Sequence, residues 1–179
     1  MNISIFCSAN NDIDPEFFTL TRELGRWIGS HGHTLVYGGC DMGLMECMAQ
    51  AVSETGGRVI GVIPSRLERG GHTSSFIDVR ILCETLGERK ELMLEQSHVA
   101  VALPGGLGTL DEIFSMAAEG TLAYHDKPVV VYDMKGFWSD LKTLLDRLQE
   151  RGLMRGDYNR HITFANTLEE VVEAISCHP

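Results

Sequence analysis

The chain has 179 residues, of which 44 % are hydrophobic and 22 % charged, an ordinary globular balance that excludes a disordered protein. Fifteen basic and twenty-five acidic residues give a net charge of −10. Long-range repulsion then excludes nucleic acid and anionic membranes as general partners, although a local pocket of donors could still bind a small anion. The length suits one hydrophobic core, so we expect residues 1–179 to form a single domain.

The cysteines and the N-terminus bear on the compartment. The five cysteines are odd in number and include no C-x-x-C pair, which fits a reducing interior. The seven histidines do not cluster with them, so no metal site is predicted. The first seven residues lack the basic and apolar regions of a signal peptide. No apolar stretch approaches the ~20 residues of a membrane-spanning helix. We therefore expect a cytoplasmic protein.

Short β-rich runs alternate with helical patterns from one end of the chain to the other. Strands are predicted at residues 2–7, 34–37, 58–63, 76–82, 98–103, 128–132 and 161–164. Helices are predicted at residues 15–30, 42–54, 85–96, 109–119, 137–151 and 168–175. The segment 65–75 is rich in Gly, Arg and Ser and is predicted to be a loop.

This alternation predicts the fold class. Strands separated by helices of about 10–15 residues form βαβ units. The strands are almost continuously apolar, which indicates a parallel sheet that is buried on both faces. We therefore expect an α/β fold, Rossmann-like and doubly wound, with a mostly parallel sheet and helices on both faces. A ligand should bind beyond the carboxyl ends of the strands.

The first glycine-rich turn, residues 38–43, reads G-G-C-D-M-G. In the dinucleotide pattern G-x-G-x-x-G, Cys40 takes the place of the second glycine, which a pyrophosphate needs for close approach. About twenty residues later, the ribose-binding acid of that pattern is replaced by Ile63-Pro64. NAD and FAD are therefore disfavoured, and tight packing explains this turn at least as well as ligand contact.

The second glycine-rich turn, residues 104–112, reads P-G-G-L-G-T-L-D-E and follows the most apolar strand. Three glycines in four positions allow successive N–H groups to face one concavity, and the following helix directs its positive end there. A phosphate monoester fits such a cradle. The turn is not a Walker A loop, because no Gly-Lys-Ser/Thr follows.

Two charged motifs each have a structural alternative. If Thr109 is an N-cap, Glu112 falls at N3 and the two form a capping box, which spacing alone slightly favours over catalysis. Arg89-Lys90, followed by Glu91, is typical of a solvated helix face. A functional role is favoured only because this helix leads into the strand that carries the second glycine turn.

Together these motifs resemble the LOG (Lonely Guy) family of nucleoside 5′-monophosphate phosphoribohydrolases, which activate cytokinins. The resemblance rests on P-G-G-x-G-T-x-x-E at 104–112, E-R-K at 88–90, Y-G-G at 37–39, G-L-M at 43–45 and R-V-I-G-V-I-P at 58–64. It runs in the family's order from the first strand to about Arg151. One departure is Ala118-Glu119-Gly120-Thr121, where relatives carry Thr-Trp-Ala-Gln.

The resemblance implies an enzyme that hydrolyses the N-glycosidic bond of an N6-modified adenosine 5′-monophosphate, releasing the base and ribose 5-phosphate. It implies a homodimer, no cofactor, and a catalytic pair formed by Arg89 and Glu112. The implied substrate-binding positions are Gly39, Lys90, Gly105, Gly106, Leu107, Gly108, Thr109, Leu110 and Asp111. Many relatives are labelled lysine decarboxylases, but none of the four lysines has the context of a Schiff-base position.

The implied chemistry suits these residues. Breaking a ribosyl C–N bond passes through an oxocarbenium-like transition state, which a carboxylate such as Glu112 can stabilise. Two alternatives remain open at this point. The chain could bind a nucleotide or the molybdenum cofactor as a carrier without turnover, because such carriers share a related fold. It could also be a nucleosidase for plain AMP.

Overall fold

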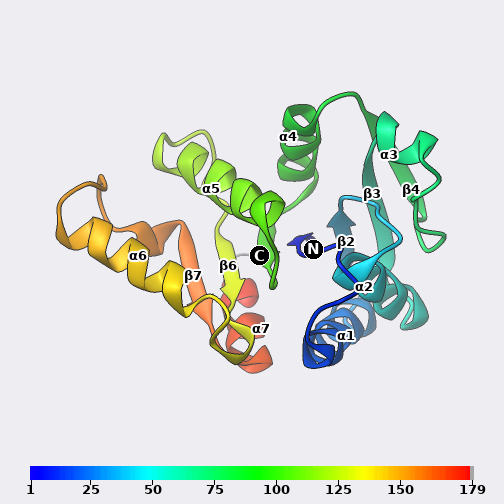
Figure 1. Cartoon of the computed structure of the whole chain (residues 1–179), viewed down its shortest axis with the longest axis horizontal. Coiled ribbons are helices and arrows are strands. Elements are labelled where there is room, and N and C mark those ends of the chain that lie inside the picture. Colours follow the sequence, from blue (N-terminus) through cyan, green and yellow to red (C-terminus); the bar gives the residue numbers. More distant parts are fainter. Residues whose placement is uncertain (178–179) are drawn as a thin grey trace.

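The computed structural model describes residues 1–177, so the last two residues of the predicted 1–179 domain lie outside the described part (Figure 1). The strands are β1 (Asn2–Phe6), β2 (Thr34–Tyr37), β3 (Arg58–Pro64), β4 (Val79–Cys83), β5 (Val99–Ala102), β6 (Val129–Tyr132) and β7 (Ile162–Ala165). The α-helices are α1 (Pro15–Ser30), α2 (Gly43–Glu54), α3 (Ser65–Arg69), α4 (Leu86–Gln96), α5 (Leu107–Thr121), α6 (Ser139–Glu150) and α7 (Leu168–Ser176).

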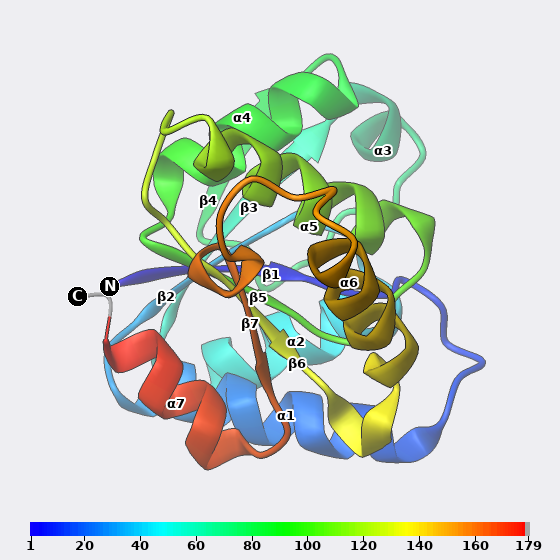
Figure 2. The same ribbon diagram turned by 90° about the vertical axis from the view of Figure 1, so that its left-hand side faces the viewer.

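The strands form one seven-stranded sheet in the order β4-β3-β2-β1-β5-β6-β7, and every neighbouring pair is parallel. Helices α1, α2 and α7 cover one face, and α4, α5 and α6 cover the other (Figure 2). The prediction of a doubly wound α/β fold with helices on both faces is confirmed. The strand order reverses direction between β1 and β5, which makes their carboxyl ends the topological switch point where ligands bind in such folds.

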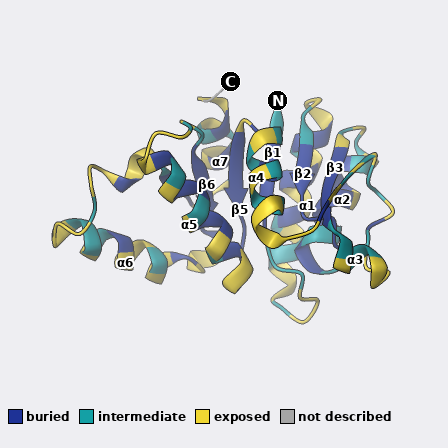
Figure 3. Cartoon of the chain, turned by 90° about the horizontal axis from the view of Figure 1, so that it is seen from above, coloured by how far each residue is buried: buried dark blue, intermediate teal, exposed yellow. Residues whose placement is uncertain are grey.

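The core has two layers because successive residues of a strand point to opposite faces of the sheet. Ile3 and Ile5 of β1 pack with α1 and α2, whereas Phe6 packs with α5 on the other face. The central strands are almost entirely buried, whereas α3 has no buried residue and much of α6 is exposed (Figure 3). Within residues 1–177, no helix is long and apolar enough to cross a membrane.

Outside helix α5, the structure differs from the predicted elements mainly in three segments. The predicted loop 65–75 begins with α3, a single short helix that ends at Gly70-Gly71. Strand β4 begins at Val79 rather than at residue 76, because Asp78 turns back to accept a hydrogen bond from the Val59 amide. The predicted helix 137–151 begins at Ser139, because Trp138 is its N-cap and the Trp138 amide donates to the Asp133 carboxylate.

Candidate functional site

A cavity of about 210 Å³ opens at the carboxyl ends of β1 and β2, beside the switch point. Segments from four places in the chain meet there: the turn after β1, the glycine turn after β2, helix α4 and the start of α5. The residues that line the cavity are Ile5, Cys7, Ser8, Ala9, Gly38, Met45, Arg89, Gly106, Gly108, Thr109 and Glu112. The position follows from the fold, because parallel strands bring their carboxyl ends to one edge.

The second glycine turn supplies one wall of the cavity. Helix α5 begins at Leu107, and its N-cap Gly106 offers no side chain to the free N–H groups of the first turn. Each of the other six α-helices in residues 1–177 has an acidic residue in its first turn, but α5 has none. The space where a Cβ would stand is empty at both Gly106 and Gly108. This wall therefore offers unpaired donors, the positive end of a helix and room for an anion.

The capping-box interpretation of Glu112 is wrong. Because α5 begins two residues before Thr109, that residue lies inside the helix and Glu112 lies in its second turn. The Glu112 carboxylate instead accepts a hydrogen bond of 2.8 Å from Nη2 of Arg89 on α4. Exposed fractions are 9 % for the Glu112 side chain and 18 % for that of Arg89. The solvated-face interpretation is thus wrong for Arg89, whose guanidinium lies in the cavity.

Helix α4 is anchored so that Arg89 comes at the end of its first turn. Thr85 is the N-cap and accepts a hydrogen bond from the Glu88 amide at 3.1 Å. The Glu88 carboxylate in turn accepts one from the Glu84 amide at 2.8 Å. Gly38 completes the approach, because a Cβ there would lie 3.3 Å from Nη1 of Arg89 and 2.8 Å from Cε of Met45. A larger residue at position 38 would displace the guanidinium.

Burial governs the ionisation of Glu112. Removal from water raises the pKa of its carboxyl group to about 7, against the opposing effect of the Arg89 positive charge. Such a carboxyl group is poised to change its charge near neutral pH, a property typical of functional sites. Burial also raises the pKa of the Cys7 thiol, which lines the same cavity. Cys7 is therefore a neutral wall residue and not a thiolate.

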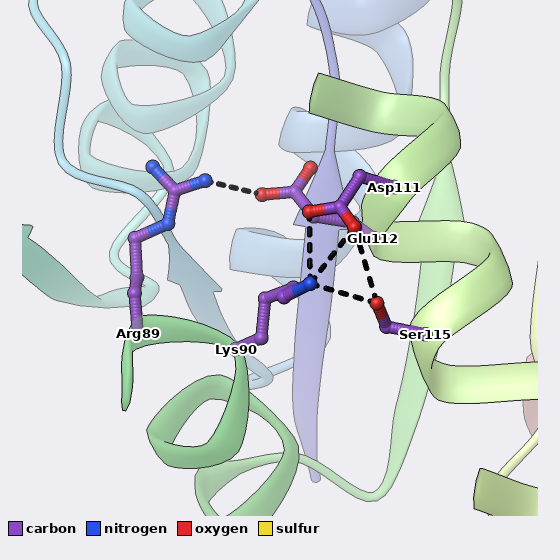
Figure 4. Close-up of polar contacts among 5 residues, drawn as sticks. All are labelled: Arg89, Lys90, Asp111, Glu112 and Ser115. Atoms are coloured by element: carbon purple, nitrogen blue, oxygen red, sulfur yellow. Dashed lines mark hydrogen bonds and ion pairs between the residues drawn. The ribbon is translucent and has the colours of Figure 1, made fainter. Parts of the chain in front are cut away.

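A second ion pair lies beside the first and outside the cavity (Figure 4). Nζ of Lys90 is 2.8 Å from each carboxylate oxygen of Asp111 and 2.8 Å from Oγ of Ser115. The Lys90 hydrogen bond and charge hold the pKa of the Asp111 carboxyl group below its usual range. Adjacent residues of α4 thus contact adjacent residues of α5.

The structure brings together five of the predicted site residues: Arg89, Gly106, Gly108, Thr109 and Glu112. The other predicted positions lie outside the cavity lining. Gly105 lies beneath the Thr109 side chain, Leu107 is 87 % exposed and Leu110 packs against the core. Gly39 has a φ of +79° and packs against Ile63, which agrees with the packing interpretation of the first glycine turn.

Sequence reasoning did not identify the cavity residues Cys7, Ser8, Ala9 and Met45. The turn after β1 bridges the two glycine turns, since the Ser8 amide donates to the Pro104 carbonyl and the Ser8 carbonyl accepts from the Leu44 amide. The signal that could have found it was its position. It follows the carboxyl end of a central strand at the switch point, where ligand contacts gather.

Comparisons with known proteins identify the family. A family model described as "Possible lysine decarboxylase" matches residues 45–175. The cytokinin riboside 5′-monophosphate phosphoribohydrolase of Mycobacterium tuberculosis is 32 % identical over 177 residues, which cover 99 % of this chain and 93 % of the relative. An Arabidopsis thaliana enzyme of the same name is 33 % identical over 181 residues, covering 98 % and 84 %. A solved molybdenum cofactor carrier protein from Chlamydomonas reinhardtii is 26 % identical, with a TM-score of 0.74 and coverage of 98 % and 96 %.

The fold and the cavity define the class: a Rossmann-like α/β protein whose site joins a donor-rich helix start to a buried arginine–carboxylate pair. The matched family model covers most of the chain, and relatives above 30 % identity cover nearly all of it. The chain belongs to the LOG family.

The description of the family model raises decarboxylation as an alternative activity. Pyridoxal phosphate enzymes hold their cofactor as a Schiff base with a lysine. Here all four lysines have partners outside the cavity: Lys90 with Asp111, Lys127 with the Leu94 carbonyl, Lys135 with Asp14 and Glu16, and Lys142 with Asp146. The residues present do not fit pyridoxal phosphate.

Proposed function

We propose that this chain hydrolyses the N-glycosidic bond of an adenosine 5′-monophosphate that carries an N6 substituent, releasing the free base and ribose 5-phosphate. The chain is an enzyme of the phosphoribohydrolase class, as its relatives' names and near full-length similarity support. The observation that carries the proposal for the site is the placement of the buried Arg89–Glu112 pair on the same small cavity as the uncapped start of α5.

The mechanism follows from what each wall offers. The 5′-phosphate binds the free N–H groups at the start of α5, with the Thr109 side chain beside them. This contact fixes the ribose so that its anomeric carbon approaches Glu112, and remote binding energy is converted into orientation. As the C–N bond breaks, positive charge develops on the ribose, and the Glu112 carboxylate stabilises it. A water molecule forms the new C–O bond at the anomeric carbon, and its proton balances the departing base, which gives ribose 5-phosphate and the free base. Arg89 keeps that carboxylate ionised and in place.

The 5′-phosphate should dominate recognition. We expect AMP and N6-isopentenyl-AMP to be cleaved with kcat/KM at least about 100-fold above the matching nucleosides, because the α5 donors have no partner without the phosphate. Release of free base, followed by chromatography, measures both rates. Equal rates for AMP and adenosine would contradict the proposal that the second glycine turn binds the 5′-phosphate.

The same assay separates the alternatives. A preference for N6-isopentenyl-AMP over AMP supports the cytokinin substrate, and the reverse preference indicates an AMP nucleosidase. The similarity to molybdenum cofactor carriers favours a second candidate, a carrier without turnover. Tight binding of a nucleotide or pterin phosphate, with release of base from none of the nucleotides, would support that carrier.

The pH dependence should report Glu112. Stabilisation of a cation requires the ionised carboxylate, and the pKa of this group is raised to about 7 by burial. We therefore expect kcat/KM to rise with pH through about 7 and then level off. A rate profile measured from pH 5 to pH 9 on AMP tests this. A profile that is flat across neutral pH would contradict the role of Glu112 as the titrating group.

The enzyme should be a homodimer, as the family resemblance implies. Exposed apolar side chains support an interface along α5: Leu107 is 87 % exposed and Phe114 40 %, and Leu122, the C-cap residue, is 63 % exposed. The spacing of seven residues places Leu107 and Phe114 on one stripe of the helix. Light scattering should give about twice the chain mass of 19.8 kDa, and Phe114→Glu should shift the protein toward monomer. A fully active wild-type monomer would contradict this expectation.

A further inference from the structure

The two ion pairs between α4 and α5 have different surroundings. Arg89 and Glu112 line the cavity, whereas Lys90, Asp111 and Ser115 are not part of its lining. Figure 4 shows the two ion pairs side by side. The side chain of Lys90 is 25 % exposed and that of Asp111 is 56 % exposed. Exposed pairs of this kind contribute little to the free energy of unfolding. The role of the outer pair therefore lies in positioning α4 relative to α5 rather than in stabilising the fold.

The cavity pair cannot fix its own geometry. Arg89 holds Glu112 through one hydrogen bond, made by Nη2. Its Nε is buried and has no hydrogen-bond partner among the described residues. An arginine with one polar contact can rotate about several bonds. The distance between the guanidinium and the carboxylate therefore depends on how α4 and α5 are held relative to each other.

The outer cluster supplies that restraint. The Lys90 ammonium contacts three oxygen atoms at 2.8 Å, two from Asp111 and one from Ser115. Ser115 is four residues beyond Asp111, so the two lie one turn apart on the same face of α5. Its hydroxyl also donates to Oδ1 of Asp111 at 3.3 Å. One side chain of α4 is thus tied to two successive turns of α5, directly beside the cavity pair.

We propose that Lys90, Asp111 and Ser115 form an interhelical clamp that positions Arg89 against Glu112, with Ser115 as a previously unassigned positioning residue. The inference rests on the proposed function. It differs from the role that the family resemblance implies for Lys90 and Asp111, which is direct contact with the nucleotide. A Lys90 ammonium whose three protons already have acceptors has no free donor for a phosphate. The clamp acts on catalysis through Arg89 and Glu112.

A charge swap distinguishes the clamp from a substrate contact. Lys90→Asp and Asp111→Lys, made singly, place like charges together and should each lower kcat on AMP about 10- to 100-fold, because small displacements at a reacting centre have large effects. The double variant restores opposite charges with the same combined side-chain length. We expect it to recover kcat to within about threefold of wild type, with KM nearly unchanged throughout.

The opposite outcome has a clear signature. If Lys90 binds the phosphate, KM will rise in both Lys90→Asp and the double variant, and the double variant will not recover activity. That result would refute the clamp. The wild-type assay tests the proposed function separately, since wild-type protein that releases no base fails before any variant is made. Glu91→Gln, on the exposed side of the same helix turn, is the matched control and should behave as wild type.

Ser115→Ala tests the new residue without altering charge. It removes one of the three Lys90 contacts and one Asp111 contact, and we expect kcat to fall about three- to tenfold with KM unchanged. Ser115→Thr keeps the hydroxyl and should retain most of the activity. Melting temperatures of all variants are measured in parallel. Unchanged kcat in Ser115→Ala, or a loss that only follows reduced melting temperature, would refute a positioning role.

Discussion

Glu112→Gln should reduce kcat on AMP by about 100-fold or more while the protein remains folded. The substitution keeps the side-chain shape and an oxygen that can accept the Arg89 hydrogen bond. It removes the negative charge that the oxocarbenium-like transition state requires, and loss of one such electrostatic contact typically costs 10²–10³ in rate, that is about 3–4 kcal/mol. Phosphate binding should survive, because the backbone donors of α5 are untouched.

Stability is the necessary control for Glu112→Gln. In wild type the folded-state pKa, about 7, lies above the ordinary value of 4.5. The stability contribution of this group is therefore full below pH 4.5 and is lost as the pH rises through about 7. At pH 8 the substitution removes the free-energy cost of burying an ionised carboxylate, which stabilises the fold. It also removes the negative charge that pairs with Arg89, which destabilises the fold, so the two effects oppose each other. A well-folded variant with near-normal turnover would return Glu112 to a structural role.

Local patterns predicted most of the fold. The apolar strand runs and the amphipathic helix 15–30 carry their own periodicity, so β2 and α1 were predicted with the bounds that the structure has. The predicted bounds are wrong where a single side chain or turn sets the end of an element. The Asp133 carboxylate binds the Trp138 amide and delays the start of α6, and Asp78 removes three residues from a predicted strand.

The candidate site shows why local sequence is not sufficient to predict a contact, because the same four-residue pattern forms a helix cap at one place and not at another. Thr85 and Glu88 form a capping interaction at the start of α4, and Thr109 and Glu112 have the same T-x-x-E spacing. The second pair does not cap, since the glycine turn lets α5 begin at Leu107 and Arg89 engages Glu112. The glycine turn itself was recognisable. The partner of Glu112 was not, because it depends on the packing of α4 beside α5.

The same contact makes Arg89 the second residue whose loss should be severe. Arg89→Met keeps much of the apolar stem but leaves the Glu112 carboxyl group buried without its hydrogen-bond donor. Because the Arg89 charge is what opposes the effect of burial, the pKa of Glu112 should rise above its wild-type value of about 7. At pH 7 the carboxyl group will then be mostly neutral, and we expect kcat/KM on AMP to fall about 100- to 1000-fold.

The pH profile identifies the cause of that loss. If Arg89 acts by keeping Glu112 ionised, the acid limb of the Arg89→Met rate profile will move to higher pH, and raising the pH will recover part of the activity. The folded protein will also bind a proton more tightly than the unfolded chain, so its melting temperature should fall as the pH rises. Arg80→Met, at an exposed position on β4, controls for loss of a surface charge and should leave both profiles unchanged. An Arg89→Met profile that is lowered uniformly, with its midpoint unmoved, would mean that Arg89 contacts the nucleotide instead of setting the charge of Glu112.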